Sequence, residues 1–360
     1  MEQTGKRALI AMSGGVDSSV AAFLMKERGF DVIGVTMKLY DNALIGEPEE
    51  SGCCSLADTD DARAVCNRLG INYYVFDFSA DFEKQVIERF ARAYEEGRTP
   101  NPCIDCNRYL KFERLMRRAR ELDRDLVVTG HYARTEYDSA SGRHLLLKSK
   151  DSSKDQTYVL FSLTQDQLAH SFFPLGDMTK EETRRIAEEQ GFVNASKRDS
   201  QDICFVPDGD YAGFLKRYRG TDYPPGDFVD MDGNVLGRHK GIVGYTIGQR
   251  KGLGLALPAP MYVIRKDVAG NRVILGYNGD LMTKRFRAAE CNWIAVEKPF
   301  DGMRVEAKIR YSQKVSPAVI HPLEDGCCEV EFDEPQRAPT PGQAAVFYDG
   351  DMVVGGGTIV

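Results

Sequence analysis

The sequence is poor in histidine and tryptophan, and it lacks the long apolar runs that cross membranes. Its 360 residues include five His and one Trp. No apolar run approaches the roughly 20 residues that a membrane-spanning helix needs. Near the N-terminus, residues 8–12 are the only apolar run before Ser-Gly-Gly, which predicts neither a secretory signal nor an organelle presequence. We therefore expect a cytoplasmic protein with no membrane association.

The sequence also lacks an excess of positive charge. Lys and Arg total 47 against 54 Asp and Glu, which gives a formal net charge of −7. A protein that holds RNA or DNA mainly by long-range attraction to phosphates carries the opposite balance. Any nucleic-acid site in this chain therefore has to be a local basic patch.

The nine cysteines do not form the pattern of a secreted disulfide framework. Their number is odd, and they include two adjacent pairs, Cys53-Cys54 and Cys327-Cys328. In a reducing compartment such cysteines fill cores, bind metals or act in catalysis. The pattern therefore favours cysteine chemistry over disulfide cross-linking.

Two regular patterns divide the chain, which at 360 residues is too long for one ordinary core. In residues 7–150 apolar strands alternate with amphipathic helices, which predicts an α/β domain with a parallel sheet covered on both faces. Residues 220–280 are rich in Gly and Pro, and period-two runs from residue 284 predict a small antiparallel β-barrel or sandwich. The predicted strands are 7–12, 31–39, 72–78 and 125–130, and the predicted helices are 18–28, 58–69, 81–96 and 108–122. The predicted domains are 1–208, 209–280 and 281–360.

The segment AMSGGVDSS, residues 11–19, follows a predicted strand and opens a predicted helix. Free N–H groups at a helix start attract phosphate, and the two glycines allow the backbone to approach it closely. Ser13 and Ser18 add hydroxyl donors. The segment lacks the Gly-Lys-Ser/Thr of a Walker loop, and Asp17 beside a phosphate implies a bridging Mg²⁺ ion. A tight turn would also need glycines, but SGGVDS resembles the pyrophosphate-binding loop of the ATP pyrophosphatases, which cleave ATP to AMP and pyrophosphate.

The segment NPCIDCN, residues 101–107, carries two cysteines with two residues between them. A structural zinc site needs four ligands, but the sequence has no second CxxC and no His pair at ligand spacing. A thioredoxin-type pair stands at a helix start soon after a first strand, whereas this pair follows a full predicted helix. We therefore predict a reactive thiol on a loop at the start of a helix, where the helix dipole favours the thiolate.

Nine segments, in order along essentially the whole chain, resemble the tRNA-specific 2-thiouridylases, a bacterial family that thiolates the wobble uridine of certain tRNAs. They are SGGVDS (13–18), NPCIDCNRYLKF (101–112), TGHYAR (129–134), KDQTYVL (154–160), DSQDICF (199–205), GYTIGQRKGLG (244–254), APMYV (259–263), IRYSQ (309–313) and PGQAAVFYDGD (341–351) with the GGG that follows. The resemblance implies an ATP-pyrophosphatase domain, a small central domain and a tRNA-contacting β-barrel. It also implies that ATP adenylylates the C2 oxygen of the wobble uridine, and that sulfur transfer then gives 2-thiouridine, AMP and pyrophosphate.

The resemblance also assigns residues to the three substrates. ATP lies along Ala11, Met12, Ser13, Gly14, Gly15, Val16, Asp17 and Ser18, with further contacts at Met37 and Gly130. The tRNA contacts fall on Asn101, Pro102, Cys103, His131, Lys154, Asp155, Gln156, Arg310, Tyr311 and Gln343. Cys204 receives a persulfide from a sulfur carrier or a cysteine desulfurase. Cys106 then attacks that persulfide, which releases the outer sulfur to the base and leaves a Cys106–Cys204 disulfide.

Other interpretations of these residues stay open at this point. Family members vary at the position of Cys103, and some carry Asp there. Cys103, Cys106 and Cys204 could instead hold three irons of a [4Fe–4S] cluster whose fourth iron binds the sulfur. Taken alone, Cys204 before Phe-Val is a typical core residue. An ATP-dependent amide ligase would not need the cysteines, and a non-catalytic iron–sulfur RNA-binding protein would not need Asp17.

Basic residues cluster in the parts of the chain that lack the ATP loop. Residues 233–266 contain six Lys or Arg and no acid. Two further clusters are Lys284, Arg285 and Arg287, and Lys308, Arg310 and Lys314. Three such clusters, with Tyr311 available for stacking, favour an RNA-binding surface over a merely solvated one. The glycines at 355–357 predict a hairpin or a bulge.

Overall fold

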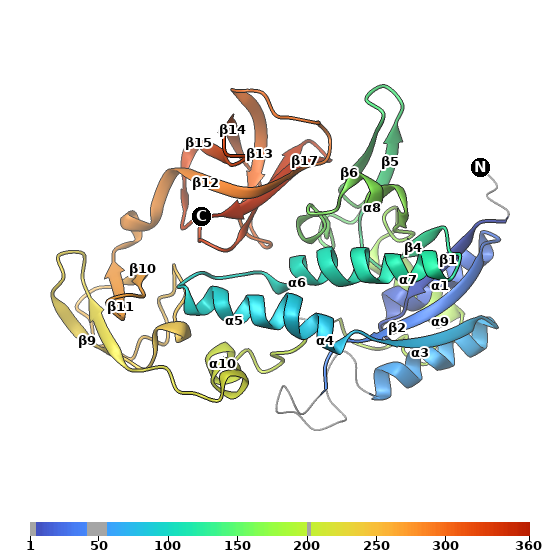
Figure 1. Ribbon diagram of the computed structural model, residues 1–360, viewed down its shortest axis with the longest axis horizontal. Coiled ribbons are helices and arrows are strands. Elements are labelled where there is room, and N and C mark those ends of the chain that lie inside the picture. Colours follow the sequence, from blue (N-terminus) through green and yellow to red (C-terminus); the bar gives the residue numbers. More distant parts are fainter. Residues whose placement is uncertain (1–4, 42–55, 200–202) are drawn as a thin grey trace.

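The computed structural model describes residues 5–41, 56–199 and 203–360 (Figure 1). Its N-terminal part is built on a five-stranded parallel sheet in the order β3-β2-β1-β4-β7, so the chain changes direction across the sheet between β1 and β4. The loop after β1 therefore lies at the switch point, where open α/β sheets bind nucleotides. The strands are β1 (Arg7–Ala11), β2 (Asp31–Lys38), β3 (Asn72–Asp77), β4 (Leu126–Val128) and β7 (Ser171–Phe172).

Helices cover both faces of this sheet, as the alternating pattern predicts. Successive side chains of a strand point to opposite faces. Ala8 and Ile10 of β1 accordingly pack with α1, α3 and α9, whereas Leu9 packs with α5, η2 and α7. The helices are α1 (Val16–Glu27), α3 (Leu56–Leu69), α4 (Ser79–Phe82), the π-helical η1 (Glu83–Ile87), α5 (Glu88–Glu95), α6 (Pro102–Asp105), the π-helical η2 (Cys106–Arg114), α7 (Leu115–Glu121), η3 (Thr157–Val159), α8 (Gln165–Ala169) and α9 (Lys180–Glu189).

The helix predicted at 108–122 begins earlier than the sequence analysis indicated. The Asn101 side chain accepts a hydrogen bond from the Cys103 backbone N–H at 3.1 Å, and Pro102 occupies the first helical position. Asn is a preferred N-cap and Pro a preferred first residue, so both signals were present in the sequence. Cys103 and Cys106 consequently lie within helical turns, and their prediction as loop residues was wrong.

A four-stranded sheet in the order β10-β11-β8-β9 forms the central part of the chain. The helix α10 precedes it and joins it to α5 (Figure 1). Arg219 of α10 pairs with Glu88 and Glu95 at 2.7 and 2.8 Å, and the Phe214 ring packs against Phe90. These elements are α10 (Tyr211–Arg219), β8 (Gly226–Val229), β9 (Val235–His239), η4 (Ile242–Gly244), β10 (Tyr262–Asp267), β11 (Arg272–Gly276) and η5 (Asn278–Leu281).

Six antiparallel strands form the C-terminal β-barrel in the order β12-β15-β14-β13-β16-β17, and pairing of β12 with β17 closes it. The predicted barrel is thus confirmed. A hairpin of the N-terminal part, β5–β6, joins the same sheet through β17, a pairing that the sequence analysis did not predict. The strands are β5 (Arg134–Asp138), β6 (Arg143–Leu147), β12 (Met282–Trp293), β13 (Met303–Lys308), β14 (Ser316–Pro322), β15 (Cys328–Arg337), β16 (Ala344–Asp349) and β17 (Met352–Ile359).

The glycines at 355–357 lie inside β17 beside register shifts in its pairing with β12 and with β16, so the predicted bulge is confirmed and the alternative of a hairpin was wrong. They face a register shift in β12 between Ala289 and Asn292. A Cβ on Gly356 would lie 2.6 Å from the ring of Phe161, which comes from the N-terminal part. Glycine is needed because another part of the chain approaches the strand closely, which no local pattern reveals.

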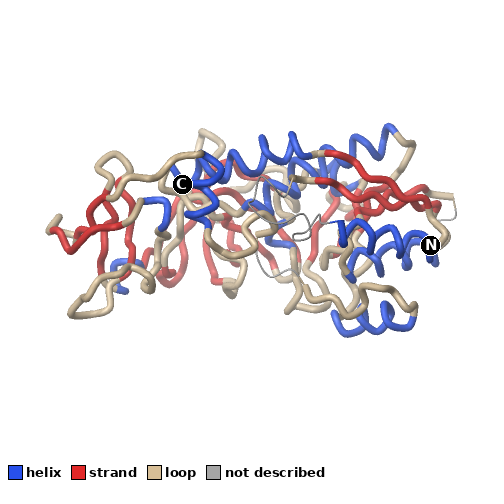
Figure 2. The backbone as a smooth tube through the Cα atoms, turned by 90° about the horizontal axis from the view of Figure 1, so that it is seen from below, coloured by secondary structure: helices blue, strands red, loops and turns tan. Residues whose placement is uncertain are grey.

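The molecule is elongated in the view of Figure 2, with the parallel sheet towards one end and the central sheet towards the other. The barrel and the helices α5 to α7 occupy the middle (Figure 1). Within the described ranges, no helix has both the length and the apolar character required to cross a bilayer.

Candidate active site

The loop between β1 and α1 is held in a shape that requires glycine. Gly14 has a φ of +73°, and a Cβ there would lie 2.4 Å from the Asp58 carbonyl oxygen. The Ser18 hydroxyl accepts from the Ser13 backbone N–H at 3.2 Å and donates to the Gly15 carbonyl at 3.0 Å. The helix α1 begins directly after Gly15, so the N–H groups of its first turn adjoin this loop. This arrangement is suited to bind phosphate.

Met37 and Gly130, the other predicted ATP contacts, lie beside this loop. Met37 is the second-last residue of β2, and the neighbouring Thr36 hydroxyl donates to the Met12 carbonyl at 2.8 Å. Gly130 follows β4, and a Cβ on it would lie 2.7 Å from the backbone carbonyl carbon of Asp17. The residues predicted to bind ATP are therefore brought together at the carboxyl ends of β1, β2 and β4.

The Asp17 carboxylate is paired with a lysine that sequence reasoning missed. Lys180 Nζ donates to both oxygens at 2.7 and 2.8 Å, and the Tyr132 hydroxyl donates to one of them at 2.9 Å. Lys180 therefore provides a second cation for Asp17 that the sequence analysis did not identify, and the bridging Mg²⁺ ion stays a prediction. The capping box of Thr179 and Glu182 marks the helix start that carries Lys180, and the sequence T-K-E-E contained that signal.

Lys180 also connects the ATP loop to the segment that leads to Cys204. Its Nζ lies 2.8 Å from Asp199 Oδ1, and Asp199 pairs with Arg184 and with Lys154 at 2.9 Å each. Burial opposes ionisation of Asp199, but hydrogen bonds from Lys154 and Lys180 outweigh it and lower its pKa to about 2. Consecutive ion pairs thus connect Lys154, a predicted tRNA contact, to Asp199 of the cysteine segment, and Asp199 through Lys180 to the ATP loop.

The three cysteines predicted to handle sulfur lie in different environments. Cys103 is exposed in the first turn of α6, Cys106 is 9% exposed at the start of η2, and Cys204 is half-buried with its carbonyl accepting from the Tyr40 hydroxyl. Burial raises the pKa of Cys106 to about 11, against a smaller lowering by Lys111. The prediction that the helix dipole favours a thiolate was therefore wrong for Cys106, because desolvation outweighs the dipole. Cys106 and Cys204 border the same apolar core.

These cysteines do not fit an iron–sulfur cluster in the described arrangement. A [4Fe–4S] cluster needs its ligand sulfurs gathered around one small volume. Across residues 5–41, 56–199 and 203–360, no three His, Cys, Asp or Glu side chains are grouped as metal ligands. Cys103, Cys106 and Cys204 are all among these residues, so they do not meet that requirement.

The predicted tRNA contacts in the N-terminal part are fixed by internal hydrogen bonds. The Gln156 side chain accepts from the Tyr132 backbone N–H at 2.9 Å, and the Asp155 carboxylate accepts from the Thr157 hydroxyl at 2.6 Å. His131 is 8% exposed, and burial lowers its pKa well below the ordinary value. The 154–156 segment is thus rigidly positioned, and His131 lies behind the surface as a neutral ring.

The barrel brings two further predicted tRNA contacts next to the cysteine helix. The Gln343 side chain donates to the Thr99 carbonyl at 2.8 Å, just before the NPCIDCN segment. The Tyr311 hydroxyl donates to the Asp155 carbonyl at 3.3 Å, and the residue stays 45% exposed. The pKa of Tyr311 is raised, mainly by burial and to a smaller extent by Asp155 and Cys103, so the phenol is neutral. The Cys103 thiol therefore lies near the Tyr311 ring. Gln343 and Tyr311 of the barrel thus contact Thr99 and Asp155 of the N-terminal part. We call these four residues the rim around Cys103.

Much of the predicted basic surface is engaged within the protein. Arg285 pairs with Glu331 at 2.7 Å. Lys266 Nζ is buried without a hydrogen-bond partner among the described residues, and burial lowers its pKa to about 8. The Arg310 guanidinium donates to the Ala338 carbonyl at 2.9 Å. The prediction of an RNA-facing side chain was therefore wrong for Lys266, because its ammonium group is buried. For Arg285, whose side chain is 59% exposed beside Glu331, it stays a prediction.

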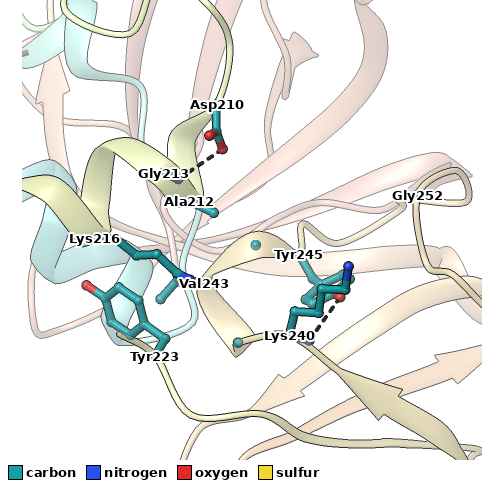
Figure 3. Close-up of a pocket in the computed structure, with 11 residues that line it drawn as sticks. Asp210, Ala212, Gly213, Lys216, Tyr223, Lys240, Val243, Tyr245 and Gly252 are labelled. Carbon is teal, nitrogen blue, oxygen red and sulfur yellow. Dashed lines mark hydrogen bonds between the residues drawn. The ribbon is translucent and has the colours of Figure 1, made fainter. Parts of the chain in front are cut away.

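A cavity of about 340 Å³ lies apart from the cysteine helix, between α10 and the turn that contains η4 (Figure 3). Lys216, Tyr223, Lys240 and Tyr245 are among the residues that line it. The Lys216 ammonium pairs with Asp222 at 2.9 Å. The lining residues include neither a cysteine nor a residue of the ATP loop, so the cavity is not part of the candidate active site.

Comparisons with known proteins account for the whole chain. Residues 6–208 match the tRNA methyl transferase HUP domain, residues 212–277 the tRNA methyl transferase PRC-barrel domain, and residues 283–359 the Aminomethyltransferase beta-barrel domain. The chain is 54% identical to tRNA-specific 2-thiouridylase MnmA 1 of Thermoanaerobacter sp. (strain X514), over 98% of this chain and 97% of that protein. It is 53% identical to tRNA-specific 2-thiouridylase MnmA of Acetivibrio thermocellus, over 98% and 99% of the two chains. The chain therefore belongs to the family of the tRNA-specific 2-thiouridylases MnmA.

Proposed function

We propose that this protein converts the wobble uridine of tRNA to 2-thiouridine, with ATP as the activator and a protein-borne persulfide as the sulfur source. Its relatives with more than half of their residues identical are tRNA-specific 2-thiouridylases. ATP arrives as its magnesium complex and lies on residues 11–18, with Met37 and Gly130 beside it. The products are 2-thiouridine, AMP and pyrophosphate.

The observation that carries this proposal is the position of Lys180. Its ammonium group binds Asp17 of the ATP loop and Asp199 of the segment that leads to Cys204. Asp199 in turn binds Lys154, the first residue of a predicted tRNA contact. A protein that only bound nucleotide would not need these three segments tied together. An enzyme that activates a base with ATP and then delivers sulfur to it does need them together.

In the activation step the uridine C2 oxygen attacks the α-phosphate of ATP, and pyrophosphate leaves. The C2 carbonyl is a poor electrophile, and adenylylation turns its oxygen into part of a good leaving group, AMP. Gly14 and Gly15 allow the backbone to approach the phosphates, and the Ser13 and Ser18 hydroxyls offer further donors. Lys180 adds a cation beside the loop, where negative charge collects as pyrophosphate departs.

In the sulfur step Cys204 carries the persulfide, Cys204–S–SH. The Cys106 thiol, once deprotonated, attacks the inner sulfur, which forms the Cys106–Cys204 disulfide and releases the outer sulfur as hydrosulfide. Hydrosulfide adds to C2 and displaces AMP. The persulfide is reduced and the two cysteines are oxidised, so a thiol reductant has to restore them before the next turnover. Persulfides and thiolates are good nucleophiles because they are anionic and polarisable.

The tRNA is recognised at the rim around Cys103. Asn101 and Pro102 start the helix, Tyr311 and Gln343 approach from the barrel, and the remaining contacts are His131, Lys154, Asp155, Gln156 and Arg310. The exposed Tyr311 ring is placed to stack on or hydrogen-bond an unstacked base. A persulfide-donating sulfur carrier or cysteine desulfurase has to reach the half-buried Cys204.

The test is ATP-dependent formation of 2-thiouridine on unmodified tRNA by iron-free protein supplied with a persulfide donor. Mass spectrometry of the digested nucleosides gives the product directly. We expect full activity, with one AMP and one pyrophosphate formed for each 2-thiouridine. Activity that appears only after anaerobic iron–sulfide reconstitution would overturn the persulfide route and make the three cysteines cluster ligands.

A matched pair of variants separates catalysis from folding in this assay. Cys106→Ser removes the attacking thiol, whereas Cys66→Ser changes a fully buried cysteine in the core on the other face of the sheet. We expect Cys106→Ser to abolish thiolation and Cys66→Ser to retain it. Equal loss in both variants would count against a catalytic role for Cys106.

A further inference from the structure

Three cysteines of the barrel take no part in the proposed reaction. Cys291 lies near the end of β12, Cys328 is the first residue of β15, and Cys327 directly precedes that strand. The sulfur atoms of Cys291 and Cys328 are 3.7 Å apart, although 37 positions separate the two residues in the sequence. A disulfide brings its sulfurs to roughly 2.0 Å, so a small movement of two side chains would join them.

The fold of β12 creates this juxtaposition. Up to Ala288 the strand pairs with β15, and from Ala288 onward it pairs with β17, which closes the barrel. The switch is made through a register shift after Ala289, where Glu290 has a φ of +49°. Such a bulge re-aims the side chains that follow it. Here it turns Cys291 back over the strand, so that its thiol approaches Cys328, the register partner of Ala288.

The space around the two sulfurs is arranged for a thiol pair. A Cβ on Gly357 of β17 would lie 2.9 Å from Cys291 Sγ, so the glycine leaves room for that thiol. Cys328 is fully buried, whereas Cys291 is half-buried and open to a small reagent. The hydrogen bond between the two sulfurs lowers the pKa of Cys291 and raises that of Cys328, because one proton serves both. Cys291 is therefore the nucleophile of the pair.

Cys327 faces a different environment, although it is adjacent to Cys328. Its backbone N–H donates to Asp325 at 3.1 Å, and its side chain contributes to raising the pKa of Arg287. Neighbouring residues of an extended chain point to opposite sides. Cys328 points into the barrel and Cys327 towards the Arg287 side, so the pair that can close is Cys291 with Cys328.

We propose that Cys291 and Cys328 form a reversible disulfide, a redox-active site in the barrel that is separate from Cys106 and Cys204. The Cys291 thiolate attacks one sulfur of a low-molecular-weight disulfide, which forms a mixed disulfide and releases one small thiolate. Cys328 gives its proton to that thiolate and attacks the Cys291 sulfur. The Cys291–Cys328 bond forms as the second small thiolate leaves, and this thiolate takes up from water the proton that Cys291 had released. Two protein thiols are oxidised, and one small disulfide is reduced to two thiols.

The test uses the full chain, reduced and then equilibrated without oxygen at a series of ratios of reduced to oxidised glutathione. The thiols that remain are alkylated, and peptides from a non-reducing digest are mapped by mass spectrometry. We expect a cross-linked peptide pair that contains Cys291 and Cys328, lacks two hydrogens, and disappears after dithiothreitol treatment. Failure to form this pair at ratios that oxidise other cysteines would overturn the proposal, as would a Cys327–Cys328 link in its place.

Variants and a second readout keep the result independent of any single substitution. Cys327→Ser is the matched control and should leave the Cys291–Cys328 cross-link in place, whereas Cys291→Ser should remove it. Because the bond ties β12 to β15 at the closure of the barrel, oxidised protein should unfold at a higher temperature than reduced protein in the Cys106→Ser background, which cannot form the Cys106–Cys204 disulfide. This difference should vanish when Cys291→Ser is added to that background. If it persists there, the stabilisation comes from other cysteines and the proposed site is wrong.

Discussion

The ATP loop and the cysteine helix differ in how far they are prepared for reaction. In the ATP loop, Asp17 already has its cation in Lys180, and the hydroxyl of Ser18 is held by the backbone of the loop. In the cysteine helix, Cys106 is 9% exposed and burial raises its pKa to about 11, so it is protonated at neutral pH. One site is assembled before its substrate arrives, and in the other the proposed nucleophile is buried and protonated.

This difference has a chemical reason. Phosphate binding gains from a rigid cradle, because no atoms then have to be ordered when the ligand binds. A reactive thiolate next to a persulfide would instead reduce it and release hydrosulfide before any base was activated. A buried and protonated Cys106 avoids that loss.

The strongest test of this comparison removes one essential group from each region. Asp17→Ala should abolish both pyrophosphate release and thiolation, because the ATP loop loses the partner of Lys180. Cys106→Ser should lower thiolation by more than about 1,000-fold, since it removes the attacking thiol, yet retain tRNA-dependent pyrophosphate release. Pyrophosphate release and nucleoside mass spectrometry, measured on the same samples, check both outcomes. Loss of pyrophosphate release in Cys106→Ser would show that the two regions do not act in separate steps.

A second test addresses the resting state of Cys106 directly. With a pKa of about 11, its thiolate fraction rises about tenfold for each pH unit between pH 8 and pH 10. We therefore expect its rate of alkylation by iodoacetamide, in protein without tRNA, to increase about 100-fold over this range. Peptide mapping measures that rate, with the exposed Cys103 in the same helix as an internal reference for reagent decay. A rate for Cys106 that levels off below pH 9 would contradict the buried, protonated thiol.

The parts of this molecule that local patterns determine are the parts that the sequence predicted. The parallel sheet follows from apolar runs such as 31–39, and the closed barrel follows from period-two runs after residue 284. The ATP loop was recognisable because glycines and serines at fixed spacing bind phosphate in one local geometry. In each case the residues that matter are close together in the chain, so a pattern of a few residues carries the information.

The features that the sequence did not reveal depend on distant residues. Lys180 meets Asp17 across 163 positions, and no spacing rule links them. The pKa of Cys106 was misjudged because burial comes from the whole core, whereas the helix dipole is local. Lys266 was placed on an RNA-binding surface, but its ammonium group is buried beneath Tyr94. Pairing and burial are properties of the tertiary structure, and composition alone cannot supply them.

The third test breaks the link between the two regions. Lys180→Met keeps the length of the side chain but removes the cation that binds Asp17 and Asp199, so the cysteine segment loses its attachment to the ATP loop. We expect thiolation to fall about 10- to 100-fold, as misplacement of reacting groups by about 1 Å does. Single-turnover measurements of pyrophosphate release and of thiolation locate the loss in the individual steps.

Arg185 provides the matched control for Lys180→Met. It lies on the same helix and is 68% exposed, and its only described ion pair is with Glu189 at 3.8 Å. Arg185→Met should therefore leave the rates of pyrophosphate release and of thiolation within about twofold of wild type, because an exposed ion pair contributes little to the stability of the fold. A comparable loss in Arg185→Met would mean that α9 as a whole, rather than the Lys180 bridge, is responsible.

The smallest expected effect concerns Lys266, a buried lysine that, unlike Lys180, has no carboxylate partner among the described residues. Lys266 Nζ makes no hydrogen bond among the described residues and lies 5.6 Å from the centre of the Tyr94 ring. Burial lowers its pKa from 10.5 to about 8, so the folded state binds the proton less tightly than the unfolded state does. Lys266→Met should stabilise the protein at pH 7 by about 2 kcal/mol, after allowance for the cation–π contact. Chemical denaturation measures this difference.

The pH dependence of that difference distinguishes a buried charge from simple repacking. Between the folded pKa of about 8 and the unfolded value of 10.5, the unfolded state of the wild type keeps the proton that the folded state has lost. Stability of the wild type relative to Lys266→Met should therefore rise with pH across this window, and the advantage of the variant should shrink towards pH 10. A pH-independent difference would instead assign the effect to packing against Tyr94. Lys180, which has two carboxylates, should show no such gain when replaced, because its removal leaves Asp17 and Asp199 unpaired.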